Sequence, residues 1–207
     1  MFDIICSVAS GSNAEVLKMA STLGYSNLVI AYSSLDGVYK ADVLAGFKMG
    51  LKISHAVFLD TLDKNKIIFT AKEALQDGIL CLVKAKQPEF NRFVVEKTSA
   101  SLVDIEYTHP KDHLHFRRSG LDQVLCKCAA ASKNSFFSSL NSLLSLHIEE
   151  QAKILGRIRQ NARFCAKYKV PYALCSFARD PFEMKGAHDM KALWKSLGIE
   201  PNISLPK

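Results

Sequence analysis

The sequence predicts a single-domain α/β fold, a TIM-like (β/α) barrel with seven or eight parallel strands. Three observations predict it: short apolar segments alternate with longer amphipathic ones, the apolar segments are nearly continuous, and 207 residues suit one large domain. Continuous apolar runs are typical of strands that are covered on both faces, and repeated β–α alternation indicates parallel strands joined by crossover helices. An open doubly wound sheet is the alternative. We expect residues 1–207 to form one domain, because no long linker or low-complexity tract interrupts them.

Seven segments have the apolar and β-branched composition of strands. They are Phe2–Val8, Asn27–Tyr32, Lys52–Asp60, Gly78–Ala85, Leu102–Thr108, Ser135–Asn141 and Pro171–Phe177. Helical periodicity fills the intervals between them. The predicted helices are Asn13–Leu23, Asp36–Met49, Glu89–Glu96, Gly120–Ser132, Leu146–Tyr168 and Ala187–Leu197. One segment, Lys66–Lys72, fits either an extra strand or the start of a helix.

Positive charge is concentrated in the second half of the chain. The formal net charge is +7; residues 1–110 contain 11 Lys and Arg against 12 Asp and Glu, whereas residues 111–207 contain 16 against 8. Six of the seven arginines also lie in the second half. Concentrated arginine is typical of a protein that binds a polyanion, because the planar guanidinium pairs with phosphate through two hydrogen bonds. A basic surface without a partner is the alternative.

The sequence gives no sign of a membrane or export function. No apolar run approaches the ~20 residues that a membrane span needs, and no basic region precedes the apolar start of the chain, as a signal peptide would require. Six cysteines without an export signal indicate free thiols in a reducing compartment. We therefore expect a cytoplasmic protein with no membrane partner.

Functional groups of a parallel barrel gather on the loops that follow the strands. The candidate loops are Ser10–Asn13, His109–Ser119 and Ala178–Gly186. In the second loop, His113 and His115 would lie on the same side of an extended segment, and His109 with Asp112 could complete a metal site. A metal site in a barrel usually draws ligands from several strands, so we expect an exposed basic loop and no metal or cofactor bound by the protein. A divergent metal-dependent phosphoesterase of the His-x-His barrel type is the alternative.

Other candidate chemistry has weaker support. Cys126 and Cys128 are two positions apart in a predicted helix, so their side chains point about 200° apart and cannot chelate one ion. We expect Cys128 to be buried and Cys126 to be partly exposed. Asp104 and Glu106 would share one face of a predicted strand, either as an acid/base pair or as polar residues of the barrel interior. No phosphate-binding glycine motif or G-x-S-x-G elbow is present.

The long predicted helix carries a row of cations. Its predicted buried face consists of Ile148, Ala152, Leu155, Ile158, Ala162 and Cys165. Lys153 and Arg157 lie off that face, followed by Arg159, Arg163 and Lys167 at successive i+4 steps. Like charges at this spacing repel one another by a few tenths of a kcal/mol per pair, so an external anion would compensate for them. RNA is a natural candidate, because proteins recognise it largely through its phosphate backbone and shape.

Two segments resemble a known family. RRSGLDQVLCKCA (Arg117–Ala129) and NARFCAKYKVPYALCSFARDPFEMKGAHDMKALWKSLGI (Asn161–Ile199) resemble the two signatures of the archaeal ribonuclease P protein component 3 family. The match in order and spacing runs from Gly78 to Ile199. Phe177 departs from the pattern, because the family has small residues at that strand end, and the segment SFFSSLNSLLS lacks the expected Arg-Pro. The matching positions outside the cation set are Ser119, Gly120, Asp122, Ser176, Asp180 and Asp189.

The resemblance implies a protein subunit of ribonuclease P, the endoribonuclease that removes the 5′ leader of precursor tRNA. It implies that the partner RNA performs the cleavage and uses magnesium, whereas the protein has no active site of its own and supports the fold of the RNA. A second, smaller protein subunit is a further implied partner. The first strand, FDIICSV, lacks the His-x-His pair of related metal-dependent phosphoesterases. The predicted RNA-binding residues are Arg92, Arg117, Arg118, Lys127, Arg157, Arg159, Arg163, Lys167, Lys169, Arg179 and Lys185.

Overall fold

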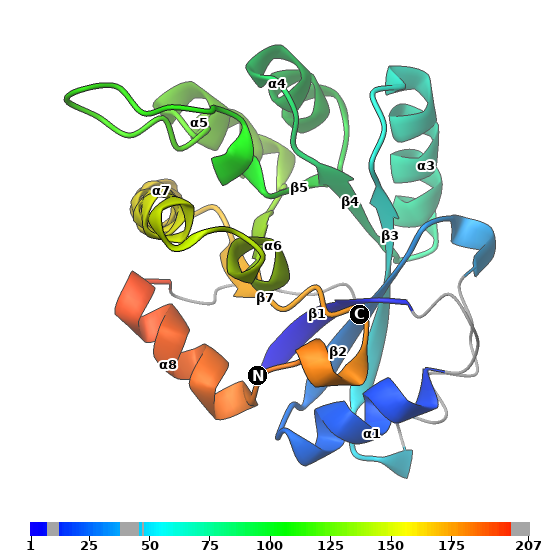
Figure 1. The fold of residues 1–207 in the computed structure, drawn as a ribbon. Coiled ribbons are helices and arrows are strands. Elements are labelled where there is room, and N and C mark those ends of the chain that lie inside the picture. Colours follow the sequence, from blue (N-terminus) through cyan, green and yellow to red (C-terminus); the bar gives the residue numbers. More distant parts are fainter. Residues whose placement is uncertain (8–12, 38–45, 47, 200–207) are drawn as a thin grey trace.

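The computed structural model describes residues 1–7, 13–37, 46 and 48–199, and in this part of the chain seven parallel strands form a barrel (Figure 1). The strands are adjacent in sequence order, and every neighbouring pair is parallel. They are β1 (Phe2–Cys6), β2 (Asn27–Tyr32), β3 (Lys52–Leu59), β4 (Leu80–Lys84), β5 (Ser101–Val103), β6 (Phe136–Ser139) and β7 (Tyr172–Cys175). Six of these strands lie within the predicted segments, whereas β5 shares only residues 102–103 with its prediction; the predicted barrel is confirmed.

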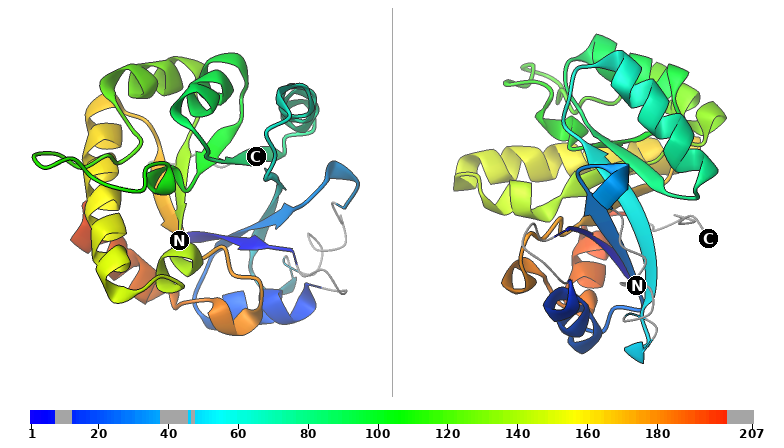
Figure 2. Two further views of the ribbon diagram at one scale, coloured as in Figure 1. Left: turned by 45° about the horizontal axis from the view of Figure 1, so that its top comes forward. Right: turned by 90° about the vertical axis from the view of Figure 1, so that its right-hand side faces the viewer.

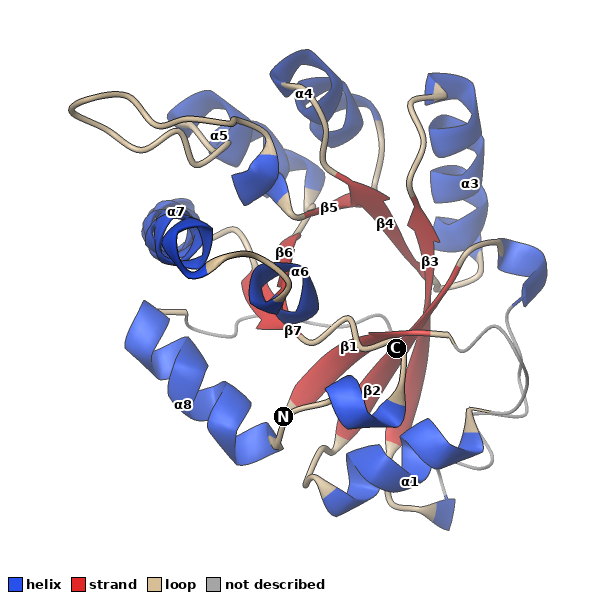
Figure 3. Cartoon of the chain, in the orientation of Figure 1, coloured by secondary structure: helices blue, strands red, loops and turns tan. Residues whose placement is uncertain are grey.

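Helices surround the barrel on the outside (Figures 2 and 3). They are α1 (Ala14–Thr22), α3 (Lys64–Gln76), α4 (Pro88–Lys97), α5 (Gln123–Ser132), α6 (Leu140–Leu144), α7 (Ile148–Tyr168) and α8 (Ala187–Leu197). Three 3₁₀ turns, Leu35–Gly37, Ile105–Tyr107 and Pro181–Glu183, follow β2, β5 and β7. The ambiguous segment 66–72 belongs to α3, where Asp63 caps the first turn by accepting hydrogen bonds from two backbone N–H groups.

Two predictions concern residues that the structure describes only in part. Most of the predicted helix 36–49, and residues 10–12 of the first candidate loop, lie outside the described residues. None of the helices in the described ranges combines the length and the apolarity that crossing a bilayer requires.

The barrel closes between β1 and the segment after β7. The Cys6 N–H donates a 2.8 Å hydrogen bond to the Ala178 carbonyl, and the Phe177 N–H donates one of 2.8 Å to the Ile4 carbonyl. The buried Asp3 carboxylate crosses the same seam, accepting hydrogen bonds from the Ser176 N–H at 2.7 Å and the Ser176 hydroxyl at 2.5 Å. A side chain thus replaces the longer strand pairing that joins the other neighbours.

One strand ends earlier than predicted. β5 stops at Val103, because Asp104 adopts a left-handed conformation (φ 62°) and the chain then enters a 3₁₀ turn. Asp104 accepts a 2.7 Å hydrogen bond from the Ser139 N–H, whereas Glu106 is buried and accepts one of 2.6 Å from the Tyr172 hydroxyl. The prediction that Asp104 and Glu106 share one strand face is therefore wrong.

The buried face of α5 also differs from the prediction. The helix begins after Asp122, whose carboxylate caps it, and packs Leu125, Cys126 and Ala129 inward. Cys126 is therefore buried, and Cys128 is the partly exposed thiol, the reverse of the expectation. Both are free thiols, and their opposite orientation agrees with the predicted helical geometry.

Replacing Asp3 by Asn should remove a pH dependence of stability. Burial raises the pKa of Asp3 to about 6, although hydrogen bonds from Ser176 and the Ile4 N–H lower it. Between pH 4 and 6 the folded protein then binds more protons than the unfolded chain, so the free energy of unfolding falls as pH rises, by about 3 kcal/mol in total. Urea denaturation at several pH values should show this fall in the wild type and a flatter profile in Asp3→Asn. Parallel profiles would contradict the assignment.

Candidate nucleic-acid interface

Helix α7 forms one wall of the candidate interface. Its 21 residues begin with Glu149 and Glu150 in the first turn, where negative charge favours the helix dipole. The buried residues of the helix are Ile154, Arg157, Ile158, Asn161, Ala162 and Cys165. The predicted face was wrong in its first half, because Ile148 is 77% exposed and Ala152 is also exposed. Two polar residues, Arg157 and Asn161, occupy inward positions instead.

Arg157 is fully buried and anchors the loop that follows β5. Its Nε donates a 2.8 Å hydrogen bond to Asp112 Oδ1, and the same carboxylate oxygen lies 2.6 Å from the second terminal nitrogen of the guanidinium. The remaining terminal nitrogen donates to the carbonyls of Glu106 and His109, both at 2.7 Å. The predicted contact of Arg157 with RNA is therefore contradicted, because none of its side chain is exposed.

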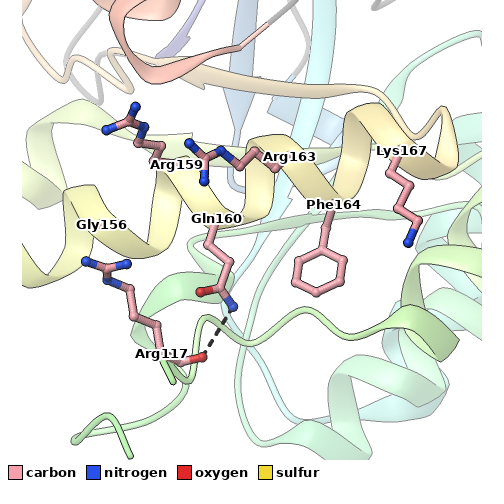
Figure 4. A pocket seen from close by; sticks show the side chains of 7 residues that line it. All are labelled: Arg117, Gly156, Arg159, Gln160, Arg163, Phe164 and Lys167. Carbon is pink, nitrogen blue, oxygen red and sulfur yellow. Dashed lines mark hydrogen bonds between the residues drawn. The ribbon is translucent and has the colours of Figure 1, made fainter. Parts of the chain in front are cut away.

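Two further side chains of α7 hold the same loop. The Asn161 amide donates to Glu106 Oε1 at 2.8 Å and to the Ser119 carbonyl at 2.9 Å. The preceding residue, Gln160, donates from its amide to the Ser119 hydroxyl at 3.1 Å and to the Arg117 carbonyl at 3.3 Å. Because Gln160 reaches the backbone of Arg117 directly, the helix fixes where the Arg117 side chain leaves the loop (Figure 4).

The matched family residues shape this loop from its other end. Gly120 has φ 85°, and a Cβ there would collide with the Ile105 carbonyl oxygen, so only glycine fits. Ser119 is buried and accepts the Gln160 hydrogen bond, while Asp122 caps α5 by accepting a 2.7 Å hydrogen bond from the Leu125 N–H. The resemblance of residues 117–129 therefore rests largely on residues that position the loop.

A basic groove lies between this loop and α7. Its volume is about 440 Å³, and Figure 4 shows the Gln160 and Phe164 side chains extending from the helix toward the loop that carries Arg117. The lining residues are Arg117, Gly156, Arg159, Gln160, Arg163, Phe164 and Lys167. The predicted row of Arg159, Arg163 and Lys167 therefore shares one cavity with Arg117. We call this cavity the α7 groove.

Gly156 allows the two walls of the α7 groove to approach. A Cβ on Gly156 would lie 2.6 Å from the Nε of Arg117, which is too close for two unbonded heavy atoms. The guanidinium of Arg117 therefore lies directly against the helix backbone. The positive charge of Arg117 therefore lies in the same groove as the cations of α7.

The four cations of the α7 groove are not neutralised by the protein. Among the described residues, no carboxylate lies within 4.0 Å of Arg117, Arg159, Arg163 or Lys167. The three ion pairs formed by Lys or Arg in that part of the chain lie elsewhere, and one of them joins Arg92 to Glu96 at 2.6 Å. The groove thus concentrates positive charge that an external anion could compensate.

The remaining predicted RNA-binding residues do not line the α7 groove. Arg92 is exposed on α4, and Lys127 is exposed on α5. Lys169 ends α7 in a left-handed conformation (φ 57°) and lines a different cavity. Arg118 and Lys185 are partly buried, and Arg179 lies at the mouth of the barrel. Their contact with RNA stays a prediction.

The loop 109–119, which we call the histidine loop, makes interactions with other protein groups. Burial alone would raise the pKa of Asp112, but hydrogen bonds from Arg157 and the Arg118 N–H lower it below its ordinary value. The pKa of His109 is lowered by burial and by the nearby arginines, and the ring of His113 stacks on Phe116 with centroids 4.3 Å apart. The described residues contain no group of three His, Cys, Asp or Glu side chains that could hold a metal ion.

Comparison with known proteins supports the family resemblance. No family model matches the chain. Curated relatives named ribonuclease P protein component 3 include those of Methanosarcina mazei, 24% identical over 96% of this chain and 80% of that protein, and Methanosarcina acetivorans, 24% identical over 92% and 77%. A relative of the same name from Methanocaldococcus jannaschii is 23% identical over 73% of this chain and 62% of that protein. The resemblance predicted from residues 78–199 is confirmed.

Solved structures show the same fold. A chain of the cryo-EM structure of archaeal ribonuclease P with mature tRNA superimposes with a TM-score of 0.73 at 21% identity, covering 96% of this chain and 83% of that one. A prolidase complexed with a phosphonate-proline compound superimposes with a TM-score of 0.53 at 10% identity, covering 95% and 70%. Both similarities show that the fold is shared.

Replacing Arg157 by Ala should destabilise the protein far more than replacing its neighbour Arg159. Removing one partner of a buried ion pair leaves Asp112 without its charged partner and two carbonyls without the donor that Arg157 supplies, so the free energy of unfolding should fall by about 3–5 kcal/mol. Arg159→Ala is the matched control, because Arg159 is exposed and unpaired, and it should change that free energy by less than about 0.5 kcal/mol. Chemical denaturation measures both values, and equal losses would contradict the anchoring role of Arg157.

Proposed function

We propose that this protein is the barrel-shaped protein subunit of a ribonuclease P and binds the RNA of that ribonucleoprotein through the α7 groove. The enzyme removes the 5′ leader of precursor tRNA. The RNA performs the cleavage with its own magnesium ions, and this chain supplies no independent active site. The relatives named ribonuclease P protein component 3 and the fold shared with archaeal ribonuclease P support the proposal.

The observation that carries the RNA contact is the set of four cations in one groove, none of them paired with a carboxylate of the described residues. Arg159, Arg163 and Lys167 follow one line of α7 and span about 12 Å, since a helix rises 1.5 Å per residue. Because the helix is rigid and Gln160 holds the backbone of Arg117, the backbone positions that carry the charges are fixed before the RNA arrives. A phosphate backbone is a periodic anion that fits such a row.

The alternative, a metal-dependent phosphoesterase built on the histidine loop, has less support. It would require Asp112 as a ligand, yet Asp112 Oδ1 accepts hydrogen bonds from Arg157 and from the Arg118 N–H. It would also require a group of His, Cys, Asp or Glu side chains close enough to hold a metal ion, and the described residues contain no such group of three. The loop is better explained as an element that α7 positions beside the RNA.

Two further parts of the proposal rest on the family resemblance. The complex would contain a second, smaller protein subunit, which together with this chain stabilises the catalytic fold of the RNA. Its substrate would be precursor tRNA, in agreement with the tRNA present in the similar archaeal assembly. We expect the complex to act in the cytoplasm.

Replacing Arg159 and Arg163 together by Ala should weaken RNA binding and flatten its salt dependence. Each lost phosphate contact removes about 0.7–0.9 from the slope of log K against log salt, so the slope should decrease by about 1.4–1.8. Filter binding or fluorescence anisotropy with the cognate RNA at several salt concentrations measures the slope.

The control for this variant is Lys66→Ala with Lys72→Ala. Both lysines are exposed on α3, which lies away from α7 (Figure 1). The control should keep the wild-type affinity to within about threefold, because surface charges that do not contact the RNA act only through screened long-range attraction. An unchanged slope in the arginine variant, or an equal effect of the control, would show that the α7 groove is not the RNA-binding surface.

A further inference from the structure

A second pocket opens at the end of the barrel where the strands finish. Its volume is about 460 Å³, and residues from β1, β3, β4, β5 and β6 line it together with α6 and the segment that follows β7. It shares no lining residue with the α7 groove. Parallel barrels bind their ligands at this end, because the loops and strand ends converge there. The RNA contact proposed above makes no use of this pocket.

We call this cavity the mouth pocket. Its two carboxylates, Asp104 and Glu183, already accept hydrogen bonds from uncharged groups. Asp104 accepts hydrogen bonds from the Ser139 N–H at 2.7 Å and from the Ser142 hydroxyl at 3.0 Å. Glu183 Oε2 accepts from the Asn141 amide at 2.7 Å and from a backbone N–H at the same distance. Neither carboxylate therefore neutralises a cation of the pocket through a direct ion pair.

The donors of the pocket are left unsatisfied. In the part of the chain that the structure describes, Lys84 and Arg179 line the pocket without a carboxylate within 4.0 Å. Tyr107 also lines it, and its hydroxyl oxygen is buried without a hydrogen-bond partner among the same residues. A buried hydroxyl without a partner is destabilising, so Tyr107 needs an acceptor that these residues do not supply. Lys84 is partly exposed and Arg179 is exposed, so both cations are accessible to an anion.

The backbone at the mouth is strained in two places. Among the described residues, four non-glycine residues have positive φ; two of them, Lys133 and Lys169, are ordinary helix ends. The other two are Asp104 (φ 62°) and Phe177 (φ 49°), and both line this pocket. Strained residues of this kind cluster at ligand sites, where the surrounding structure holds them for a function.

An aromatic surface completes the pocket. The ring of Phe177 lies 6.1 Å from that of Phe58, and both rings line the cavity. The departure of Phe177 from the small residues of the family therefore places an apolar face beside the cations. Aromatic rings and a nucleobase stack favourably, with about 1–3 kcal/mol per base in known complexes.

We propose that the mouth of the barrel binds a nucleoside 5′-monophosphate group, with the phosphate held by Lys84, Arg179 and Tyr107. The base lies against Phe58 and Phe177, and the ribose hydroxyls donate to the remaining lone pairs of Glu183 and Asp104. In this arrangement the phosphate dianion lies beside both cations. The carboxylates face ribose hydroxyls, which donate hydrogen bonds, and do not face the negatively charged phosphate. The volume is within the roughly 300–1,000 Å³ of small-molecule sites. A free nucleotide and the 5′ end of an RNA present the same group.

Calorimetric titration of the full chain with AMP tests the site, with adenosine as the probe that lacks the phosphate. AMP should saturate, and adenosine should bind at least about tenfold more weakly, because it lacks the charge-assisted hydrogen bonds. Lys84→Met and Arg179→Ala should each weaken AMP binding about tenfold or more. Arg179 is exposed, so its variant keeps the test valid even if Lys84→Met impairs folding.

Lys72→Met, on the exposed surface of α3, is the control and should bind AMP as the wild type does. A 5′-phosphorylated tetranucleotide and its 5′-hydroxyl counterpart separate the two sources of the group. Tighter binding of the phosphorylated oligonucleotide than of AMP identifies an RNA end, and the reverse identifies a free nucleotide. Failure of both AMP and the phosphorylated oligonucleotide to saturate by about 10 mM, equal binding of adenosine and AMP, or wild-type binding by both pocket variants would overturn the proposal.

Discussion

The buried guanidinium of Arg157 is the interaction on which the candidate interface depends. It connects one helix to a loop that is 45–51 residues distant in sequence, through Asp112 and the carbonyls of Glu106 and His109. A buried cation is costly to desolvate, and the Asp112 carboxylate with the two carbonyls offsets that cost for Arg157. The position of Arg117, and hence the second wall of the α7 groove, follows from that convergence. Without it, the hydrogen bonds of Lys153, Gln160 and Asn161 would remain to hold the loop against the helix.

The polar residues of helix α7 have different roles on its two faces. Inward, the side chains of Arg157 and Asn161 donate hydrogen bonds to the loop and stabilise the fold; outward, the row from Arg159 to Lys167 has no carboxylate partner among the described residues. Charges on the same helix repel one another mildly, and an RNA phosphate backbone relieves that repulsion while releasing counterions. The mouth of the barrel follows a comparable logic on a smaller scale, because its carboxylates are satisfied and its cations are not. The barrel thus carries two chemically distinct groups of cations that have no carboxylate partner among the described residues.

The sequence predicted the strands well, because each is an apolar run that is buried on both faces, and it predicted that Arg159, Arg163 and Lys167 share one line. It failed where a polar residue is buried. Hydrophobic periodicity treats arginine as exposed and therefore predicts Arg157 at the surface. Its burial depends on the ion pair with Asp112, which is distant in sequence. Likewise, β5 was extended to Thr108 because nothing local reveals that Asp104 turns to φ 62° to reach Ser139. Interactions between residues far apart in sequence decided each of these errors, and no pattern within one segment records them.

The most direct test is cleavage of precursor tRNA by the cognate ribonuclease P RNA at limiting magnesium, with and without this protein and its small partner subunit. A protein that holds the RNA in its active fold lowers the magnesium needed, because its cations neutralise phosphates that the metal ions would otherwise screen. The account predicts that the cleavage rate rises when this chain is added and does not rise with the partner subunit alone. An unchanged rate in the presence of the correctly folded protein would contradict its role as a subunit of the enzyme.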